Sequence, residues 1–332
     1  MLDHDDYRGA RYFPALDGLR AVAVVLVAFA LYASSRFNWL DEWVGVSVFF
    51  VLTGFLVTRL LLRPEPLKEF YARRFFRLVP LYLAILLGVA AFAYLRGEFQ
   101  IREMPRLLMY YLTFNNEFAG ADPLFGTSWI VGIEAKFYLV WPLAVVALGR
   151  FAPLALVPAV ALVPFSGMAV SYVLLLLGSV VAFVLHYPRT FALVRPLTHP
   201  WAVVPVGLLC IGLSRWHLGV GIGASLLVIC LVSSGPVHHV FSAFRFVGRR
   251  AYAMYLLLLP THFVVVLVAP PLKQDSLVTV ATVLVVSLCL ADLVHRWVEK
   301  PVTAFGKRLL AKRQAPPTAD HEPTQPSMAA AA

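Results

Sequence analysis

GVSVFFVLTGFLVTRLLL, residues 45–62, is an unbroken apolar run with a single charged side chain, Arg59. The hydrocarbon core of a bilayer requires a helix of about 20 mostly apolar residues. Backbone polar groups in lipid must pair within the protein, and this run does not alternate between polar and apolar residues as a barrel strand does. The run therefore predicts a membrane-spanning helix.

The rest of the chain repeats this pattern. The sequence of 332 residues is 60% hydrophobic and 14% charged, whereas soluble domains are about one half apolar and one quarter charged. We therefore predict an all-α, polytopic membrane helix bundle with about ten transmembrane helices. A further stretch, 104–118, is too short and polar to span and is expected to form an interfacial or re-entrant helix. The predicted spans are 14–34, 44–63, 78–95, 128–148, 152–166, 169–186, 200–214, 218–234, 251–270 and 277–297.

Basic residues lie mainly in every second loop, counted from the N-terminus. By the positive-inside rule, both termini are expected in the cytoplasm and the protein in the cytoplasmic (inner) membrane of the cell. The net charge of +10 then reflects topology and contact with the lipid bilayer, and no nucleic-acid partner is predicted. We divide the chain into a transmembrane domain, 1–305, and a basic, then disordered, cytoplasmic tail, 306–332.

Ionisable side chains inside a membrane are costly, so each is a functional candidate. Glu134 lies in TSWIVGIEAKFYLVWP, residues 127–142, and is expected towards the outer end of its span. A carboxylate there needs a partner or a cavity, and Lys136, two residues on, faces away. Glu134 is thus the best candidate for a functional carboxylate. The histidines and cysteines do not have metal-ligand spacing, so no metal site is predicted.

Two groups of charged residues lie at predicted cytoplasmic ends of helices. Arg73, Arg74 and Arg77 share a helical face and suit phosphate recognition, because guanidinium groups bind phosphates bidentately. The alternative is an anchor on lipid phosphate, which spacing alone slightly favours. Asp17 and Arg20 open the first span, either as a helix cap with a topology-setting arginine or as functional residues.

In their order along the chain, these segments resemble the acyltransferase-3 family of membrane O-acyltransferases. That family acylates bacterial surface polysaccharides and some antibiotics from an acyl-CoA donor. The resemblance covers nearly the whole chain to about residue 305. The segments that carry it are LDGLRAVAVVLV (16–27), GVSVFFVLTGFLVTRLLL (45–62), FYARRFFRLVPLY (70–82), TSWIVGIEAKFYLVWP (127–142), GRRAYAMYLLLLP (248–260) and VEKP (298–301).

The resemblance implies transfer of an acyl group, acetyl by expectation, from acyl-CoA to a hydroxyl of a carbohydrate or glycosylated acceptor. No bound cofactor is implied, because acyl-CoA is the donor substrate. Arg73, Arg74 and Arg77 would bind the acyl-CoA, which reverses the weighting from spacing alone. Glu134 would orient or deprotonate the acceptor, and Arg20 would hold the donor or stabilise developing negative charge. Support for the substrate is implied for Asp17, Trp129, Tyr138, Tyr255 and His262.

The chain departs from the family pattern in the first helix. The family usually carries there a histidine regarded as the catalytic base, and here Ala30 or Leu31 occupies the place. Three explanations stay open: a substitution introduced at Ala30, a base moved to Glu134 or His262, or a relative that binds acyl-CoA without catalysis. A transporter, the less favoured alternative, predicts inverted repeats and paired broken spans, which the sequence does not display.

Overall fold

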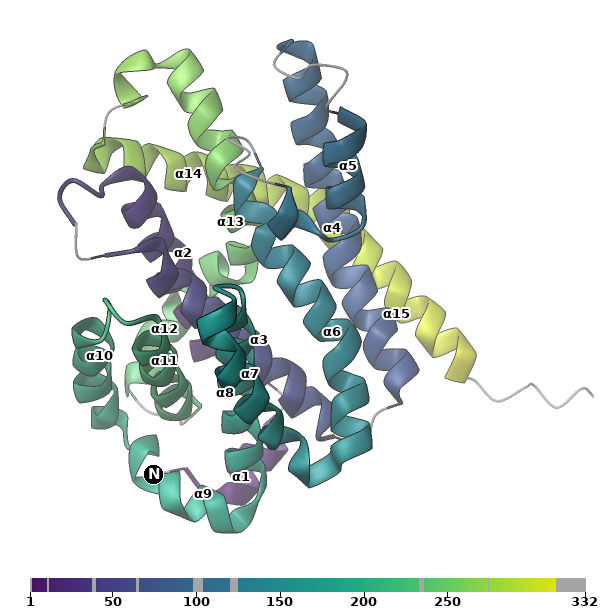
Figure 1. Cartoon of the computed structure of the whole chain (residues 1–332), viewed down its shortest axis with the longest axis vertical. Coiled ribbons are helices and arrows are strands. Elements are labelled where there is room, and N and C mark those ends of the chain that lie inside the picture. The colour runs from purple at the N-terminus through teal and green to yellow at the C-terminus, as the bar shows by residue number, and fades with distance from the viewer. Residues whose placement is uncertain are drawn as a thin grey trace, which may run out of the picture.

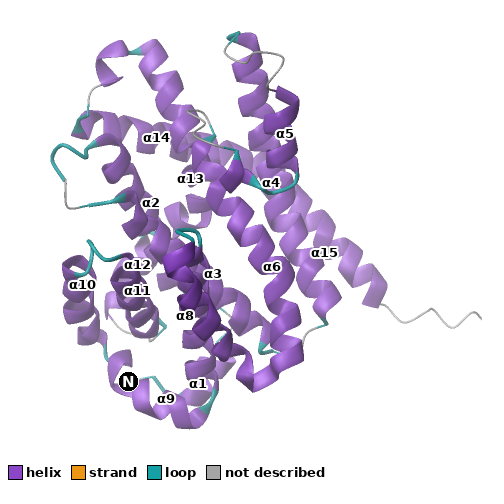
Figure 2. Ribbon diagram, viewed as in Figure 1, coloured by secondary structure: helices purple, strands orange, loops and turns teal. Residues whose placement is uncertain are grey.

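The computed structural model describes residues 2–10, 12–37, 40–63, 66–97, 104–119, 125–232, 236–273 and 275–314. Within these ranges the chain forms helices and turns and contains no strand (Figure 2). The prediction of an all-α protein is thereby confirmed.

Seven α-helices form the long elements of the bundle (Figure 1). They are α2 (Pro14–Tyr32), α3 (Glu42–Leu61), α4 (Leu67–Leu95), α6 (Trp129–Leu148), α8 (Ala169–His186), α13 (Arg245–Val268) and α14 (Leu277–Val294). The others are α1 (His4–Gly9), α5 (Met104–Leu112), α7 (Leu156–Leu162), α9 (Pro188–Val194), α10 (Val203–Gly212), α11 (His217–Leu231), α12 (Pro236–Ala243) and α15 (Lys300–Gln314). A π-helical turn, His295–Glu299, joins α14 to α15.

The predicted spans do not all correspond to separate spanning helices. In the described part of the chain, seven helical runs are long and apolar enough to cross a membrane, or eight if a pair bent by 89° counts as one span. Spans 128–148 and 152–166 fall in one run, Gly126–Phe165, and 200–214 falls mostly in the bent pair. Span 218–234 falls on the shorter α11, which is largely buried. The number of ten and the side of the termini stay predictions.

Helix α3 is the centre of the bundle and packs against α2, α6, α8 and α11. Its contact with α8 is close because both helices present glycine. A Cβ atom at Gly54 would collide with the carbonyl oxygen of Leu175, and one at Gly178 with that of Val51. Small residues at such contacts let membrane helices approach at van der Waals distance. The pair thus fixes α3 against α8.

Two further helix contacts lie near the functional candidates of α2 and α4. Gly248 of α13 lies directly against the backbone of Asp17 in α2, so these two helices meet near their first turns. Helix α15 packs beside α4 (Figure 1). At this contact the ring centres of Phe76 and Phe305 are 6.2 Å apart. The predicted domain boundary at 305/306 falls inside α15, and the tail beyond Gln314 lies outside the described residues.

The stretch 104–118, expected to form an interfacial or re-entrant helix, contains α5 and a 3₁₀ turn, Asn116–Phe118. Asn116 is buried and its amide donates to Tyr82 and to Ser128, both at 2.8 Å. These bonds fasten the turn to α4 and to the segment that leads into α6.

Candidate active site

Two adjoining cavities lie at the end of the bundle where α2, α4 and α13 begin and α3 and α14 end, and both are lined by Arg20, Leu56, Arg74, Arg77, Arg249 and Glu299. The larger one, of about 400 Å³, is called the outer chamber, and the smaller one, of about 70 Å³, which reaches Glu134, the inner chamber; together they are called the cavity. The charged residues of the outer chamber are Asp17, Arg20, Arg59, Arg63, Arg74, Arg77, Arg249, His295 and Glu299. Arg20, Arg74, Arg77, Arg249 and Glu299 also line the inner chamber, together with Thr53, Glu134, Tyr138 and Tyr252.

Helix α4 supplies two arginines to both chambers. The guanidinium group of Arg74 lies over the rings of Phe70 and Tyr138, at 5.5 Å and 5.3 Å from their centres. Cation–π contacts of this kind hold the group in place while its N–H groups stay available to a ligand. Arg77 follows one turn later. Arg73 is placed differently: it pairs with Glu69 at 3.6 Å and lines neither chamber. It lies in a groove between α4 and α15, to which Arg74 and Arg77 also contribute.

Helix α2 contributes a buried carboxylate and the arginine that it orients. Arg20 Nη1 donates to Asp17 Oδ1 at 2.9 Å, and the hydroxyl of Tyr12 donates to Asp17 Oδ2. Arg249 Nε lies 4.0 Å from the same oxygen. Burial, and then the neighbouring carboxylate, raise the pKa of Tyr12. The capping role considered for Asp17 is wrong, because α2 begins at Pro14 and Asp17 uses its oxygens on side chains.

Glu134 is buried and accepts a hydrogen bond of 2.6 Å from the Thr53 hydroxyl. Thr53 stands about 16 Å from the start of α3 and about 12 Å from its end, so the carboxylate lies near the middle of that helix. Within its own helix, Glu134 is the sixth of the 20 residues of α6, which begins after the buried residues Thr127 and Ser128. The position of Glu134 towards the outer side of the membrane stays a prediction. Lys136 faces away, as expected, and pairs with Glu117.

Four groups of predicted site residues do not line this cavity. Trp129 packs against Trp43 and Phe50, and Tyr255 packs against Phe49, which itself lines the inner chamber. His262 stacks on Tyr32 with ring centres 4.5 Å apart. Ala30 and Leu31 lie near that stack, about 15 Å along α2 from Arg20. The position of the family histidine is thus remote from the arginines.

The sequence interpretation missed several residues of the cavity wall, among them Thr53, Arg59, Arg63, Arg249, His295 and Glu299. Threonine carries no charge cost that would make it conspicuous in an apolar run, and the arginines were explained by topology. Glu299 in VEKP offered a usable signal, since an acid at the basic end of the last span needs a partner. In the described ranges, no three His, Cys, Asp or Glu side chains cluster as a metal site requires.

The chain is similar to several bacterial O-acetyltransferases of known name. The chain is 26% identical to the peptidoglycan O-acetyltransferase OatA of Listeria monocytogenes, over 89% of its length and 56% of that protein. It is 27% identical to the O-acetyltransferase OatA of Staphylococcus aureus, over 91% and 59%. It is 24% identical to the putative peptidoglycan O-acetyltransferase YrhL of Bacillus subtilis, over 91% and 57%.

The chain thus spans a little more than half the length of these relatives. No solved structure matches it. The model of the acyltransferase-3 family, described as an acyltransferase domain, matches residues 13–296, which is most of the chain. The resemblance inferred from the sequence is thereby confirmed, and the chain belongs to the acyltransferase-3 family.

Proposed function

We propose that this protein is a membrane O-acyltransferase that moves a short acyl group from acyl-CoA to a hydroxyl of a cell-surface glycan. One observation carries the proposal: the arginine-rich outer chamber shares Arg20, Arg74 and Arg77 with the adjoining chamber that contains the buried carboxylate of Glu134. The family and the named activities of the relatives support acyl transfer to a carbohydrate.

The outer chamber has the charge that an anionic donor requires. Six arginines line it against two carboxylates, Asp17 and Glu299. Coenzyme A carries phosphates, which guanidinium groups bind bidentately. The inner chamber has room for only a few water molecules, which favours acetyl over a long acyl chain.

In this proposal, an acceptor hydroxyl enters the inner chamber and meets the acyl group of the donor there. Thr53 donates to Oε1 of Glu134, and Oε2 has no hydrogen-bond partner among the described residues. That oxygen is therefore available to orient an acceptor hydroxyl. Arg20, held by Asp17, is placed to stabilise the oxyanion that forms when the hydroxyl attacks the carbonyl carbon.

We also propose that the arginine-rich end faces the cytoplasm, so that both termini lie on the cytoplasmic side of the inner membrane. The positive-inside rule and the location of acyl-CoA support this orientation. Reporter fusions at residues 1 and 332 should both report a cytoplasmic location. A fusion that reports an external C-terminus would reverse the orientation of the cavity.

A second candidate function is donor binding without turnover, favoured by the alanine or leucine at the position of the family histidine. Purified protein in nanodiscs, supplied with acetyl-CoA and an oligosaccharide acceptor, separates the two. Release of free CoA thiol together with acetylated glycan supports the transferase. Saturable CoA binding with neither product would identify an inactive relative, and acetylation only from acetyl phosphate would reject CoA as the donor.

A further inference from the structure

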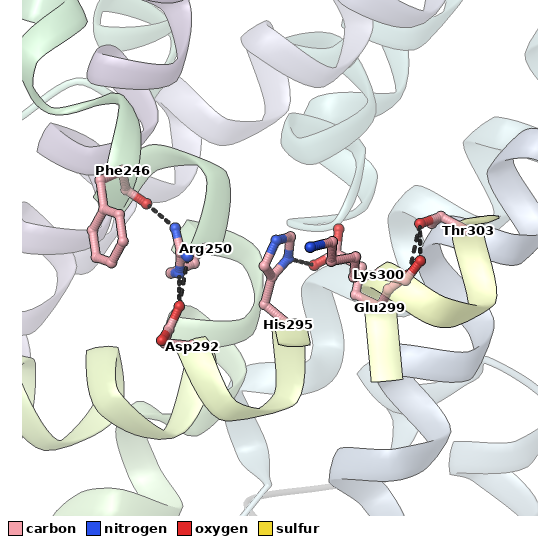
Figure 3. Close-up of polar contacts among 7 residues, drawn as sticks. All are labelled: Phe246, Arg250, Asp292, His295, Glu299, Lys300 and Thr303. Carbon is pink, nitrogen blue, oxygen red and sulfur yellow. Dashed lines mark hydrogen bonds and ion pairs between the residues drawn. The ribbon is translucent and has the colours of Figure 1, made fainter. Parts of the chain in front are cut away.

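The junction between α14 and α15 is a wide π-helical turn over His295–Glu299. Its closing hydrogen bond runs from the N–H of Lys300 to the carbonyl oxygen of His295. Within the turn, His295 Nδ1 lies 2.7 Å from Glu299 Oε2 (Figure 3). Single π-helical turns occur frequently at functional sites because they re-aim side chains. The turn therefore merits a chemical explanation.

Both ends of the turn are fixed by hydrogen bonds (Figure 3). Before it, Asp292 accepts from Arg250 Nε and from Arg296 Nη2, both at 2.7 Å. Arg250 also donates to the carbonyl oxygen of Phe246 at 2.9 Å, which ties the turn to α13. After it, the Thr303 hydroxyl donates to the carbonyl oxygen of Glu299 at 2.7 Å. The imidazole and the carboxylate thus stand on a rigid support.

The two side chains form part of the cavity wall. His295 and Glu299 line the outer chamber, and Glu299 also lines the inner chamber with Glu134. Their side chains are only 27% and 17% exposed. Nδ1 is taken by the carboxylate, while Nε2 has no hydrogen-bond partner among the described residues.

A carboxylate at Nδ1 selects the tautomer with its proton there and leaves the lone pair on Nε2. This is the state that a general base needs. The charged groups that share the cavity wall are Asp17, Arg20, Arg59, Arg63, Arg74, Arg77, Arg249 and Glu134. A purely structural ion pair at a helix end would need neither a position in this wall nor an unpaired nitrogen.

We propose that His295 is the general base of the reaction and that Glu299 is its positioning residue, together replacing the histidine absent at Ala30 or Leu31. This proposal rests on the proposed acyl transfer. The family model ends at residue 296, so the pairing with Glu299 lies partly outside the matched region.

In the proposed acyl transfer, one proton moves from the acceptor hydroxyl to the departing thiol by way of His295. Nε2 of His295 takes the proton of the acceptor hydroxyl while the hydroxyl oxygen bonds to the carbonyl carbon of the thioester. The tetrahedral species collapses, the carbon–sulfur bond breaks, and the imidazolium returns its proton to the departing thiolate. The products are an ester and free CoA thiol. Glu299 stays ionised and stabilises the imidazolium.

The test compares variants in nanodiscs with acetyl-CoA and an oligosaccharide acceptor. His295→Ala should lower kcat by about 10²–10⁴-fold with CoA affinity unchanged, and added imidazole should restore part of the rate. Glu299→Gln should lower kcat less than His295→Ala does and leave KM for acetyl-CoA unchanged, whereas Glu299→Asp, which keeps a carboxylate, should retain more of the rate. His217→Ala, which removes a partly exposed histidine stacked on Trp43, should behave as wild type.

Two outcomes separate failure of this proposal from failure of the proposed function. If the wild type turns over and His295→Ala keeps its rate, His295 is not the base and acyl transfer stands. If the wild type does not turn over, both fail. A readout without turnover is carbethoxylation of His295 by diethylpyrocarbonate, followed by mass spectrometry. CoA should protect His295, and unchanged labelling in saturating CoA would overturn its position at the donor site.

Discussion

Replacement of Arg74 by alanine tests the donor site most directly, because the structure predicts how much affinity each arginine contributes. A hydrogen bond to a charged group contributes about 1.5–3 kcal/mol, and each 1.4 kcal/mol is roughly tenfold in Kd. Arg74 is partly buried and held between two aromatic rings, so its value should lie at the upper end. Arg74→Ala should weaken CoA binding by about 150-fold.

Arg77 is more exposed, and solvent screens its interactions. We therefore expect only about tenfold weaker binding in Arg77→Ala. Arg73→Ala should lose less still, since Arg73 pairs with Glu69 outside the cavity. Isothermal titration with CoA in nanodiscs gives the three values. Lys68→Ala is the matched control, because Lys68 is exposed in the first turn of the same helix and its loss changes net charge equally.

The relative loss of CoA affinity among the four variants distinguishes a specific donor site from attraction by net charge. If Arg74→Ala binds CoA as tightly as Lys68→Ala does, the arginine cavity is not the donor site. If all four variants lose affinity equally, binding depends on net charge and not on the geometry of the wall. Raising the salt concentration should weaken wild-type binding more than that of Arg74→Ala, since one screened contact is already missing.

Three further predictions follow from particular contacts. Glu134→Gln should lower kcat by about 100-fold with CoA affinity unchanged. Thr53→Val, which removes the hydrogen bond to Glu134, should lower kcat about tenfold. A Glu134→Gln variant that keeps its rate would remove Glu134 from the site. Gly178→Ala should destabilise the protein by about 1–3 kcal/mol, seen as a lower melting temperature in detergent, whereas Gly88→Ala, where a Cβ meets nothing within 4 Å, should be neutral. Ala30→His should not raise turnover, because residue 30 is about 15 Å along α2 from Arg20, and a large gain would return the base to that position.

The sequence predicted individual site residues better than it predicted their partners. Arg20, Arg74, Arg77, Glu134 and Tyr138 were each singled out, since charge in a membrane is costly and the family motifs mark these positions. The structure brings all five to one cavity. What joins them is the packing of α2, α3, α4, α6 and α13. No spacing within one helix encodes that packing.

Arg73 shows the limit of a periodicity argument. At about 100° per residue, Arg73, Arg74 and Arg77 cover an arc of about 100°, with Arg77 between the other two. Such an arc fits one face, yet the cavity covers only part of it. Arg74 and Arg77 fall inside, while Arg73 faces Glu69 one turn earlier. Which of the three arginines face the cavity depends on where α15 packs on α4. The sequence pattern of α4 carries no information on that packing.

The span count fails for a related reason. An apolar run identifies a segment that avoids water, and such a segment can be buried either in lipid or in the protein interior. Helix α11 has only 15 residues and is buried for most of its length, so its apolar character reflects protein packing as much as membrane contact.

The choice of base can be narrowed by the bonds already made in the described cavity wall. A general base must lie within hydrogen-bond reach of the hydroxyl it activates. If Arg20 stabilises the oxyanion, residue 30 is excluded, because about 15 Å of α2 separates the two. Asp17 is engaged by Arg20 and Tyr12, and Glu299 by His295. Glu134, Glu299 and His295 each keep one atom without a hydrogen bond among the described residues, Oε2, Oε1 and Nε2, and Glu299 is proposed above to orient His295. Glu134 and His295 are thus the two candidates for the base.

Chemical rescue separates these two candidates, because each missing group is replaced by its own small analogue. Imidazole should restore turnover to His295→Ala and not to Glu134→Ala, since a carboxylate that only orients the acceptor is not replaced by a diffusing base. Formate rescue of Glu134→Ala, with no imidazole rescue of His295→Ala, would assign the proton transfer to Glu134. The first result would mean that the chain has kept the reaction of its family while moving the base from the first helix to the last.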